Sequence, residues 1–215
     1  MNIGKSLTTR SNECPVVCVI DDDVSVREGL ESLIRAAGWH ARTFSLAREF
    51  LACPRFQEPC CLILDLSLPD LSGLQLQHQI ADRPELPVIF LTGDGDVPTS
   101  VTAMKAGARE FMTKPFRQQE LLDAIDSAIQ HSRAVLERDA AHRVLEERYA
   151  VLTSRERQVM ALVVQGKANK CIGADLGISE ITVKAHRGKV MRKMMARSIA
   201  ELVVFSGRLA ARGNT

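Results

Sequence analysis

The fold of the N-terminal half is decided by the stretch Val16-Val17-Cys18-Val19-Ile20-Asp21-Asp22-Asp23. Five consecutive apolar residues, four of them β-branched, are typical of a strand that is buried on both faces of a parallel sheet. The three aspartates that follow end this run. Because open parallel sheets bind ligands at the carboxyl ends of their strands, this stretch predicts an acidic site at that edge.

Strands and amphipathic helices alternate on the C-terminal side of this stretch. The predicted strands are 16–20, 39–44, 60–64, 88–91 and 110–113. The predicted helices are 26–37, 46–53, 73–80, 97–106 and one from 116 onward. This alternation predicts an α/β, flavodoxin-like domain, with a five-stranded parallel sheet of order 2-1-3-4-5 and helices on both faces.

Length and composition exclude several classes of protein. The 215 residues exceed the usual length of one domain, which favours two separate cores. No apolar run approaches the ~20 residues that span a bilayer, and the first residues lack the apolar core of a secretory signal. The six cysteines show no ligand-like spacing. We therefore expect a cytoplasmic protein with no membrane partner and no structural zinc.

The net charge of +2 conceals an asymmetry between the two halves. Residues 1–125 carry 12 basic and 17 acidic side chains, a net charge of −5. Residues 126–215 carry 16 basic and 9 acidic side chains, a net charge of +7. A basic C-terminal module suggests a polyanionic partner, although a solvated charged face remains an open alternative on charge alone.

The sequence indicates four segments. They are an N-terminal tail (1–13), the α/β domain (14–125), a helical linker (126–150) and a small all-α domain (151–215). No Gly or Pro occurs between Phe116 and Gln165, so the last helix of the first domain should continue into the linker. Its sparse apolar positions allow either a coiled-coil seam between two copies or a solvated spacer.

The C-terminal segment has the pattern of a helix-turn-helix domain. Thr153 to Glu156 reads as a capping box, and Gly166 stands where that helix should stop. A second helix is expected at 169–176, and Ser179 is placed to cap a third helix after a tight turn. The third helix has an apolar face and a basic face, as expected of a helix that enters the major groove of DNA.

Chemistry is expected where the strands end. Asp21 and Asp22 follow the first strand and Asp65 follows the third, which is its neighbour in the predicted order. Three crowded carboxylates repel one another unless a cation neutralises them, and Mg²⁺ prefers oxygen ligands. We therefore predict a Mg²⁺ site made by Asp22 and Asp65 directly, Asp21 through water, and the backbone carbonyl of Ser67.

Asp65 is the predicted phosphoacceptor in this pocket. An aspartate can attack phosphorus when a metal neutralises the phosphoryl oxygens. Lys114 after the fifth strand can pair with the added oxygens as a point charge, and Thr92 after the fourth strand supplies a hydroxyl. A cis bond between Lys114 and Pro115 would direct the ammonium into the pocket.

The ordered set of these residues resembles the receiver domain of two-component response regulators. The stretches that carry the resemblance are 19–23, 64–65 with 68–70 and Gly73, 91–93, and 114–116. The resemblance implies that Asp65 accepts a phosphoryl group from a histidine of a sensor kinase, and that Asp21 and Asp22 hold Mg²⁺. It also implies that Thr92 and Phe111 form the switch.

The C-terminal segment resembles a LuxR-type helix-turn-helix domain, through residues 152–157, 169–170, 178–179 and 182–187. Together the two domains have the arrangement of the NarL/FixJ family, closest to the FixJ type. The resemblance implies five DNA-contacting residues, namely Thr182, Lys184, Arg187, Lys189 and Arg192. His186 is expected to pack rather than to read bases, and Gly188 departs from the longer side chains found in the family.

These observations predict a phosphorylation-dependent DNA-binding transcriptional regulator rather than a turnover enzyme. The expected partners are a cognate sensor histidine kinase, double-stranded promoter DNA, RNA polymerase and a second copy of the chain after phosphorylation. Two alternatives remain. Asp21-Asp22-Asp23-Val24 also fits a haloacid dehalogenase-like phosphatase, which would need a further acidic pair where Asp123 and Asp126 stand. The output could also act by protein contact.

Overall fold

The computed structural model describes residues 14–93 and 96–211, so the predicted tail at 1–13 lies outside the described residues. The chain divides into two compact units, Met1–Glu137 and Arg138–Thr215. Within the described ranges, no helix is both long and apolar enough to cross a membrane, and all six cysteines are free thiols.

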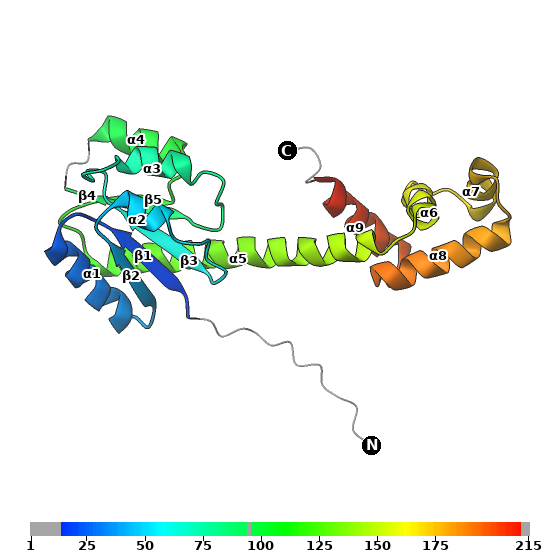
Figure 1. Cartoon of the computed structure of the whole chain (residues 1–215), viewed down its shortest axis with the longest axis horizontal. Coiled ribbons are helices and arrows are strands. Elements are labelled where there is room, and N and C mark those ends of the chain that lie inside the picture. Colours follow the sequence, from blue (N-terminus) through cyan, green and yellow to red (C-terminus); the bar gives the residue numbers. More distant parts are fainter. Residues whose placement is uncertain (1–13, 94–95, 212–215) are drawn as a thin grey trace, which may run out of the picture. The chain divides into compact units, whose positions relative to one another are not determined.

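The N-terminal unit is built from alternating strands and helices (Figure 1). The strands are β1 (Val16–Ile20), β2 (His40–Phe44), β3 (Cys60–Leu64), β4 (Val88–Thr92) and β5 (Glu110–Thr113). The helices are α1 (Val24–Ala36), α2 (Ala47–Leu51), α3 (Gly73–Gln79), α4 (Val97–Lys105) and the first part of α5 (Gln118–Ala150). The sheet has the order β2-β1-β3-β4-β5 and every pairing is parallel, which confirms the predicted fold class.

Helices cover both faces of this sheet (Figure 1). Because successive side chains of a strand point to opposite faces, Cys18 and Ile20 of β1 pack on the side of α2, α3 and α4. Val17 and Val19 pack on the side of α1 and α5. The five residues of β1 are all buried, as their uninterrupted apolar run predicted.

Helix α5 continues without interruption for 33 residues, as the absence of Gly and Pro predicted. Its side chains Ala128, Ile129 and Ser132 are buried, so the core of the N-terminal unit extends past residue 125 into the segment predicted as a linker. Ser132 accepts a hydrogen bond from the Cys60 backbone N–H (3.0 Å) and donates to the Glu85 carbonyl (2.5 Å). This contact fixes α5 against the amino ends of β3 and β4.

The C-terminal unit is helical, with the end of α5 followed by α6 (Ser154–Val164), α7 (Asn169–Leu176), α8 (Glu180–Met194) and α9 (Ile199–Ala211). The predicted caps are confirmed: Thr153 and Glu156 form a capping box, and Ser179 caps α8. Gly177 ends α7 in a left-handed conformation (φ 65°), which glycine adopts without steric cost. The core includes Val159, Ile172, Val183, Val190 and Met194.

Candidate functional site

Three carboxylates converge at the carboxyl edge of the sheet. β1 and β3 are neighbours, and the Asp65 backbone N–H donates to the carbonyl of Ile20 at 2.9 Å. This register places Asp65 beside Asp21 and Asp22, and one carboxylate oxygen from each lies within 4.8 Å of the others. Asp21 and Asp65 are buried whereas Asp22 is exposed, so the cluster opens to solvent on one side.

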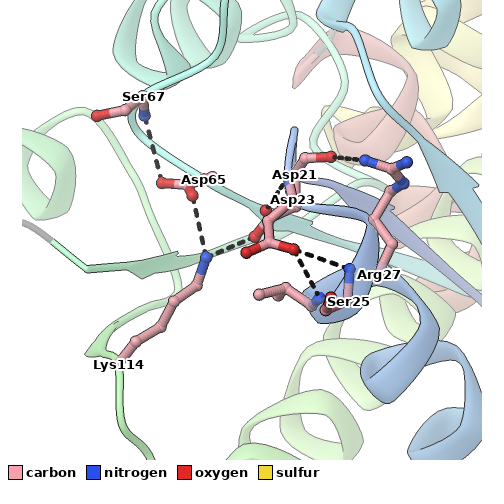
Figure 2. Close-up of polar contacts among 8 residues, drawn as sticks. Asp21, Asp23, Ser25, Arg27, Asp65, Ser67 and Lys114 are labelled. Atoms are coloured by element: carbon pink, nitrogen blue, oxygen red, sulfur yellow. Dashed lines mark hydrogen bonds and ion pairs between the residues drawn. The ribbon is translucent and has the colours of Figure 1, made fainter.

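Lys114 reaches this cluster from the end of β5, on the far side of β4 (Figure 2). Its Nζ lies 2.6 Å from Asp21 Oδ2 and 3.0 Å from Asp65 Oδ2, between the two carboxylates. The peptide bond between Lys114 and Pro115 is cis. Burial alone would lower the pKa of Lys114, but its hydrogen bonds to Asp21 and Asp65 outweigh burial and raise it.

The electrostatics of the pocket favour an additional cation. Burial raises the pKa of Asp21 and outweighs the opposing hydrogen bond from Lys114, and the neighbouring Asp65 carboxylate also raises it, so a further positive charge would stabilise the ionised form of Asp21. Carboxylate oxygens are the ligands that Mg²⁺ prefers, and the set contains one exposed and two buried carboxylates. The residues present therefore fit a hard divalent cation, as an acidic pocket of this kind typically does.

The loop that carries Asp65 is held tightly by backbone contacts. The Ser67 N–H donates to Asp65 Oδ1 (3.3 Å), and the Gly73 N–H donates to the Leu66 carbonyl (2.9 Å). A Cβ on Gly73 would stand only 2.4 Å from the Asp65 carbonyl oxygen, so this position requires glycine. The first turn of α3 thus lies directly against the loop after β3.

Thr92 and Phe111 occupy neighbouring strands, as predicted. Thr92 ends β4 and is 1% exposed, and its carbonyl accepts a hydrogen bond from the Lys114 backbone N–H (2.7 Å). Phe111 on β5 is partly buried and lies against Phe90, with a ring-centroid distance of 6.0 Å. The structure therefore shows Phe111 packed on the core face of the sheet.

Three polar contacts around the pocket were not predicted. Asp70 accepts hydrogen bonds from the Ala47 and Arg48 backbone N–H groups (3.1 and 3.0 Å) and so caps α2. The N-cap residue of α2 is Leu46, whose side chain has no hydrogen-bond acceptor. Arg27 donates to the Asp21 carbonyl (2.7 Å). No local sequence signal identifies these pairs, because their partners come together only in the folded chain.

The alternative phosphatase site is not assembled. Asp123 and Asp126 both lie exposed on α5, and Asp123 accepts a hydrogen bond from Gln119 one turn away (2.9 Å). The acidic pair that such an enzyme needs after the lysine is therefore absent from the described pocket.

Helix α8 carries the residues predicted to contact DNA. Lys184, Lys189 and Arg192 are exposed, as expected. Thr182 is half-buried, and its hydroxyl lies 2.8 Å from that of the cap residue Ser179. Arg187, which the sequence placed outward, is half-buried and donates to Asn169 Oδ1 of α7 (2.5 Å). Arg187 therefore joins the two helices of the helix-turn-helix as well as adding positive charge.

His186 packs as expected, since it is half-buried and its Nδ1 is buried without a hydrogen-bond partner among the described residues. Beside α8, an open pocket of about 590 Å³ is lined by Thr153, Glu156, Lys189, Arg192 and Lys193. Lys193 donates to Glu156 (2.6 Å) and lowers the pKa of that carboxyl to about 2. The remaining cations of the pocket, Lys189 and Arg192, face solvent.

Comparisons with known proteins identify both units. Residues 17–126 match the family described as "Response regulator receiver domain", and residues 150–206 match "Bacterial regulatory proteins, luxR family". The chain is a response regulator of the NarL/FixJ family. The receiver model covers the α/β unit, and the luxR model covers the helices of the C-terminal unit.

Relatives of this response regulator match along nearly its whole length. "Nodulation protein W" of Bradyrhizobium diazoefficiens is 42% identical over 212 residues, covering 98% of this chain and 93% of the relative. "Response regulator protein TodT" of Pseudomonas putida is 45% identical over 202 residues, covering 93% and 88%. The structure of response regulator StyR superposes with a TM-score of 0.82 at 44% identity, covering 91% of this chain and 100% of that chain.

The predicted class of function is confirmed by this membership. The response regulator is a phosphorylation-dependent DNA-binding transcriptional regulator, and its partners are a sensor kinase and DNA.

Proposed function

We propose that Asp65 is the phosphoacceptor, and the single observation that carries this is the pairing of Lys114 Nζ with both Asp21 and Asp65. Asp65 lies at the centre of the pocket with its backbone held by Ile20 and its side chain between Ser67 and Lys114 (Figure 2). A carboxylate oxygen of Asp65 attacks the phosphorus of a phosphohistidine, the P–N bond breaks, and the histidine nitrogen takes up a proton.

Asp22 and Asp65 would hold Mg²⁺ directly, with Asp21 acting through water and Ser67 through its backbone carbonyl. When bound, the ion neutralises the phosphoryl oxygens during transfer. Lys114 is already within hydrogen-bonding distance of Asp65, so it can exchange a carboxylate oxygen for a phosphoryl oxygen with little movement. The receiver promotes its own phosphorylation in this way and is not a turnover enzyme.

The new phosphoryl group adds a charge of about −1.5 to −2 at Asp65. Lys114 and the Thr92 hydroxyl would move towards it, and the partly buried Phe111 on β5, which already packs against Phe90, would turn further inward as Thr92 leaves its resting position. Since the Lys114 N–H already bonds to the Thr92 carbonyl, the ends of β4 and β5 would move together.

The face of α4 and β5 is proposed as the surface that dimerises after phosphorylation. Val97, Val101 and Met104 repeat every three or four residues along α4 and are 75%, 44% and 45% exposed. An exposed apolar stripe of this kind favours association with another protein surface. Dimerisation would present two copies of α8 to a two-fold-related DNA site.

In the output domain, Lys184 and Arg187 are proposed to lie near base edges or phosphates, and Thr182, Lys189 and Arg192 to bind mainly phosphates. The open pocket that contains Lys189 and Arg192 supports this, because both cations face solvent beside the amino end of α6. The bound dimer is proposed to activate transcription by contacting RNA polymerase. The segments 14–125, 126–150 and 151–215 are proposed as receiver, linker and output domain, with the first turns of the linker completing the receiver core through Ala128, Ile129 and Ser132.

The proposal is tested by measuring DNA affinity of the full-length protein with and without a small-molecule phosphodonor and Mg²⁺. The DNA is a duplex selected from random sequences by the phosphorylated protein. Asp65→Asn should abolish the gain in affinity that the phosphodonor causes, which we expect to be about 5- to 150-fold. An undiminished gain in Asp65→Asn would contradict the assignment.

Asp23→Asn is the matched control. Asp23 is exposed beside the pocket, and its Oδ1 accepts hydrogen bonds from the N–H groups of Ser25 and Val26 at the start of α1. Asparagine keeps this capping oxygen but removes the same charge as Asp65→Asn. The control should respond to the phosphodonor as the wild type does.

A further inference from the structure

One line of exposed residues runs along α8 directly opposite its buried face. An α-helix turns about 100° per residue, so Val183, Val190 and Met194 fall within one narrow sector, and all three are buried. Ile181, Ala185 and Gly188 fall in the opposite sector, and all three are exposed. This sector is the part of α8 that protrudes furthest from the core.

Ile181 is the apolar side chain of this sector, and it is 82% exposed. It is the second residue of α8, directly before Thr182, whose backbone N–H is capped by Ser179. In a helix-turn-helix protein, the amino-terminal residues of the second helix are those that contact base edges. Ile181 therefore stands where a base contact is made, but it has no group that can form a hydrogen bond.

The surroundings of Ile181 favour close approach to DNA. Ala185 and Gly188 are small, and a Cβ on Gly188 would meet nothing within 4 Å, so packing within the domain does not require glycine there. The exposed cations Lys184 and Lys189 flank this sector, and Arg192 lies within it near the carboxyl end of α8. A polyanion attracted by these cations would meet an apolar and small-residue surface between them.

We propose that Ile181 contacts the 5-methyl group of a thymine in the major groove and thereby selects for sequence. Thymine is the base that presents a methyl group in that groove, and apolar side chains recognise it by contact. This inference rests on the proposed function, in which α8 enters the major groove. It adds a specificity-determining residue to the five proposed DNA-contacting residues.

Few polar side chains in the same part of α8 are free to form hydrogen bonds with base edges. Arg187 is already bonded to Asn169, and the Thr182 hydroxyl lies against Ser179. Gly188 offers no side chain. Apart from Lys184, this part of the helix therefore recognises DNA more by shape and by contact with methyl groups than by hydrogen bonds.

The test compares DNA that differs only in the thymine methyl groups. A duplex selected from random sequences by the full-length phosphorylated protein is prepared with thymine or with uracil at every thymine position. Wild-type affinity should fall about threefold to tenfold on the uracil duplex, because burial of one methyl group corresponds to roughly a fourfold change. Ile181→Ala should bind the thymine duplex about as weakly as wild type binds the uracil duplex, and should not distinguish the two.

Val204→Ala on α9 is the matched control. Val204 lies in the same unit and is 51% exposed, and its substitution likewise removes only apolar atoms. It should keep the wild-type ratio between the two duplexes. If Ile181→Ala retains the full preference for thymine, or full affinity for the thymine duplex, the contact is disproved. If no duplex is enriched in the selection, the proposed DNA-binding function fails, and this contact fails with it.

Discussion

The two units place their functional groups in opposite ways. In the receiver, Asp21 and Lys114 are 93 positions apart in the sequence, yet their side chains are 2.6 Å apart in a partly buried pocket. In the output domain, the proposed DNA contacts all lie between Ile181 and Arg192 on the single helix α8. The first site depends on the packing of a whole sheet, whereas the second depends on one helix presenting its outer face.

This difference predicts that substitutions which disturb backbone packing damage the receiver site most. The largest effect is expected for Gly73→Ala, because the new Cβ would collide with the Asp65 carbonyl oxygen at 2.4 Å. We expect a loss of about 3 kcal/mol in the free energy of unfolding of the N-terminal unit. Denaturant unfolding followed by the fluorescence of Trp39, the single tryptophan, measures it.

Gly29→Ala is the control for that experiment. Gly29 lies within α1, and a Cβ there would meet nothing within 4 Å, so alanine should stabilise the helix by up to about 1 kcal/mol. The two glycine substitutions should therefore shift the Trp39 transition in opposite directions. A shift in the same direction would show that close packing at Gly73 does not matter.

The next largest effect concerns the partly buried ion pair between Glu156 and Lys193 in the output domain. Glu156 is 3% exposed, and its hydrogen bonds with Lys193 and the Thr153 backbone lower its pKa from 4.5 to about 2. Glu156→Gln should cost roughly 2 kcal/mol in the free energy of unfolding of the C-terminal unit. The near-ultraviolet circular dichroism of Tyr149, the single tyrosine, follows this unit.

The pair of Glu156 and Lys193 also predicts that the stability of the C-terminal unit depends on pH. A carboxyl with a lowered pKa contributes its full stability above pH 4.5, and this contribution is lost as the pH falls through about 2. Wild type should thus lose stability between these values, and Glu156→Gln should lose less. Glu147→Gln, an exposed residue on α5, should follow the wild-type curve. Equal acid sensitivity of wild type and Glu156→Gln would disprove the role of the pair.

A smaller effect is expected at the contact between α5 and the sheet. Ser132→Ala would leave the Cys60 N–H and the Glu85 carbonyl without their shared partner. The free energy of unfolding, measured from the fluorescence of Trp39, should fall by about 1 to 2 kcal/mol. Ser127→Ala, on an exposed position of the same helix, should cost less than about 0.5 kcal/mol. Equal losses of stability in Ser132→Ala and Ser127→Ala would show that the hydrogen bonds of Ser132 do not stabilise the receiver core.

The smallest effects are expected on the open face of the output domain. Lys189→Ala and Arg192→Ala should each lower DNA affinity for all sequences, and should each reduce the slope of log affinity against log salt by about 0.9. Neither should change the unfolding of the domain. Lys167→Ala removes a charge that pairs with Asp175 (2.7 Å) and should leave the slope unchanged. A loss confined to one DNA sequence would argue against phosphate binding.

Much of the fold was predictable because its signals are local. The buried run of β1, the capping box at Thr153 and the end of α7 at residue 176 each depend on neighbouring residues, and all were confirmed. The strand order was also confirmed, since the topology of alternating strands and helices has few solutions. The association of Asp21, Asp65 and Lys114 followed from that order, since parallel strands end at one edge.

Contacts between distant side chains were not predictable from periodicity. The sequence alone determined the elements, the caps of α6 and α8, the two-unit organisation and the acidic edge of the sheet, because those properties depend on neighbouring residues and on the few topologies open to alternating strands and helices. Only the tertiary structure decided that Asp70 caps α2, that Ser132 joins α5 to the sheet, and that Arg187 bonds to Asn169. The physical reason is that each contact needs two backbones held at one distance, and that distance is set by the packing of the whole unit.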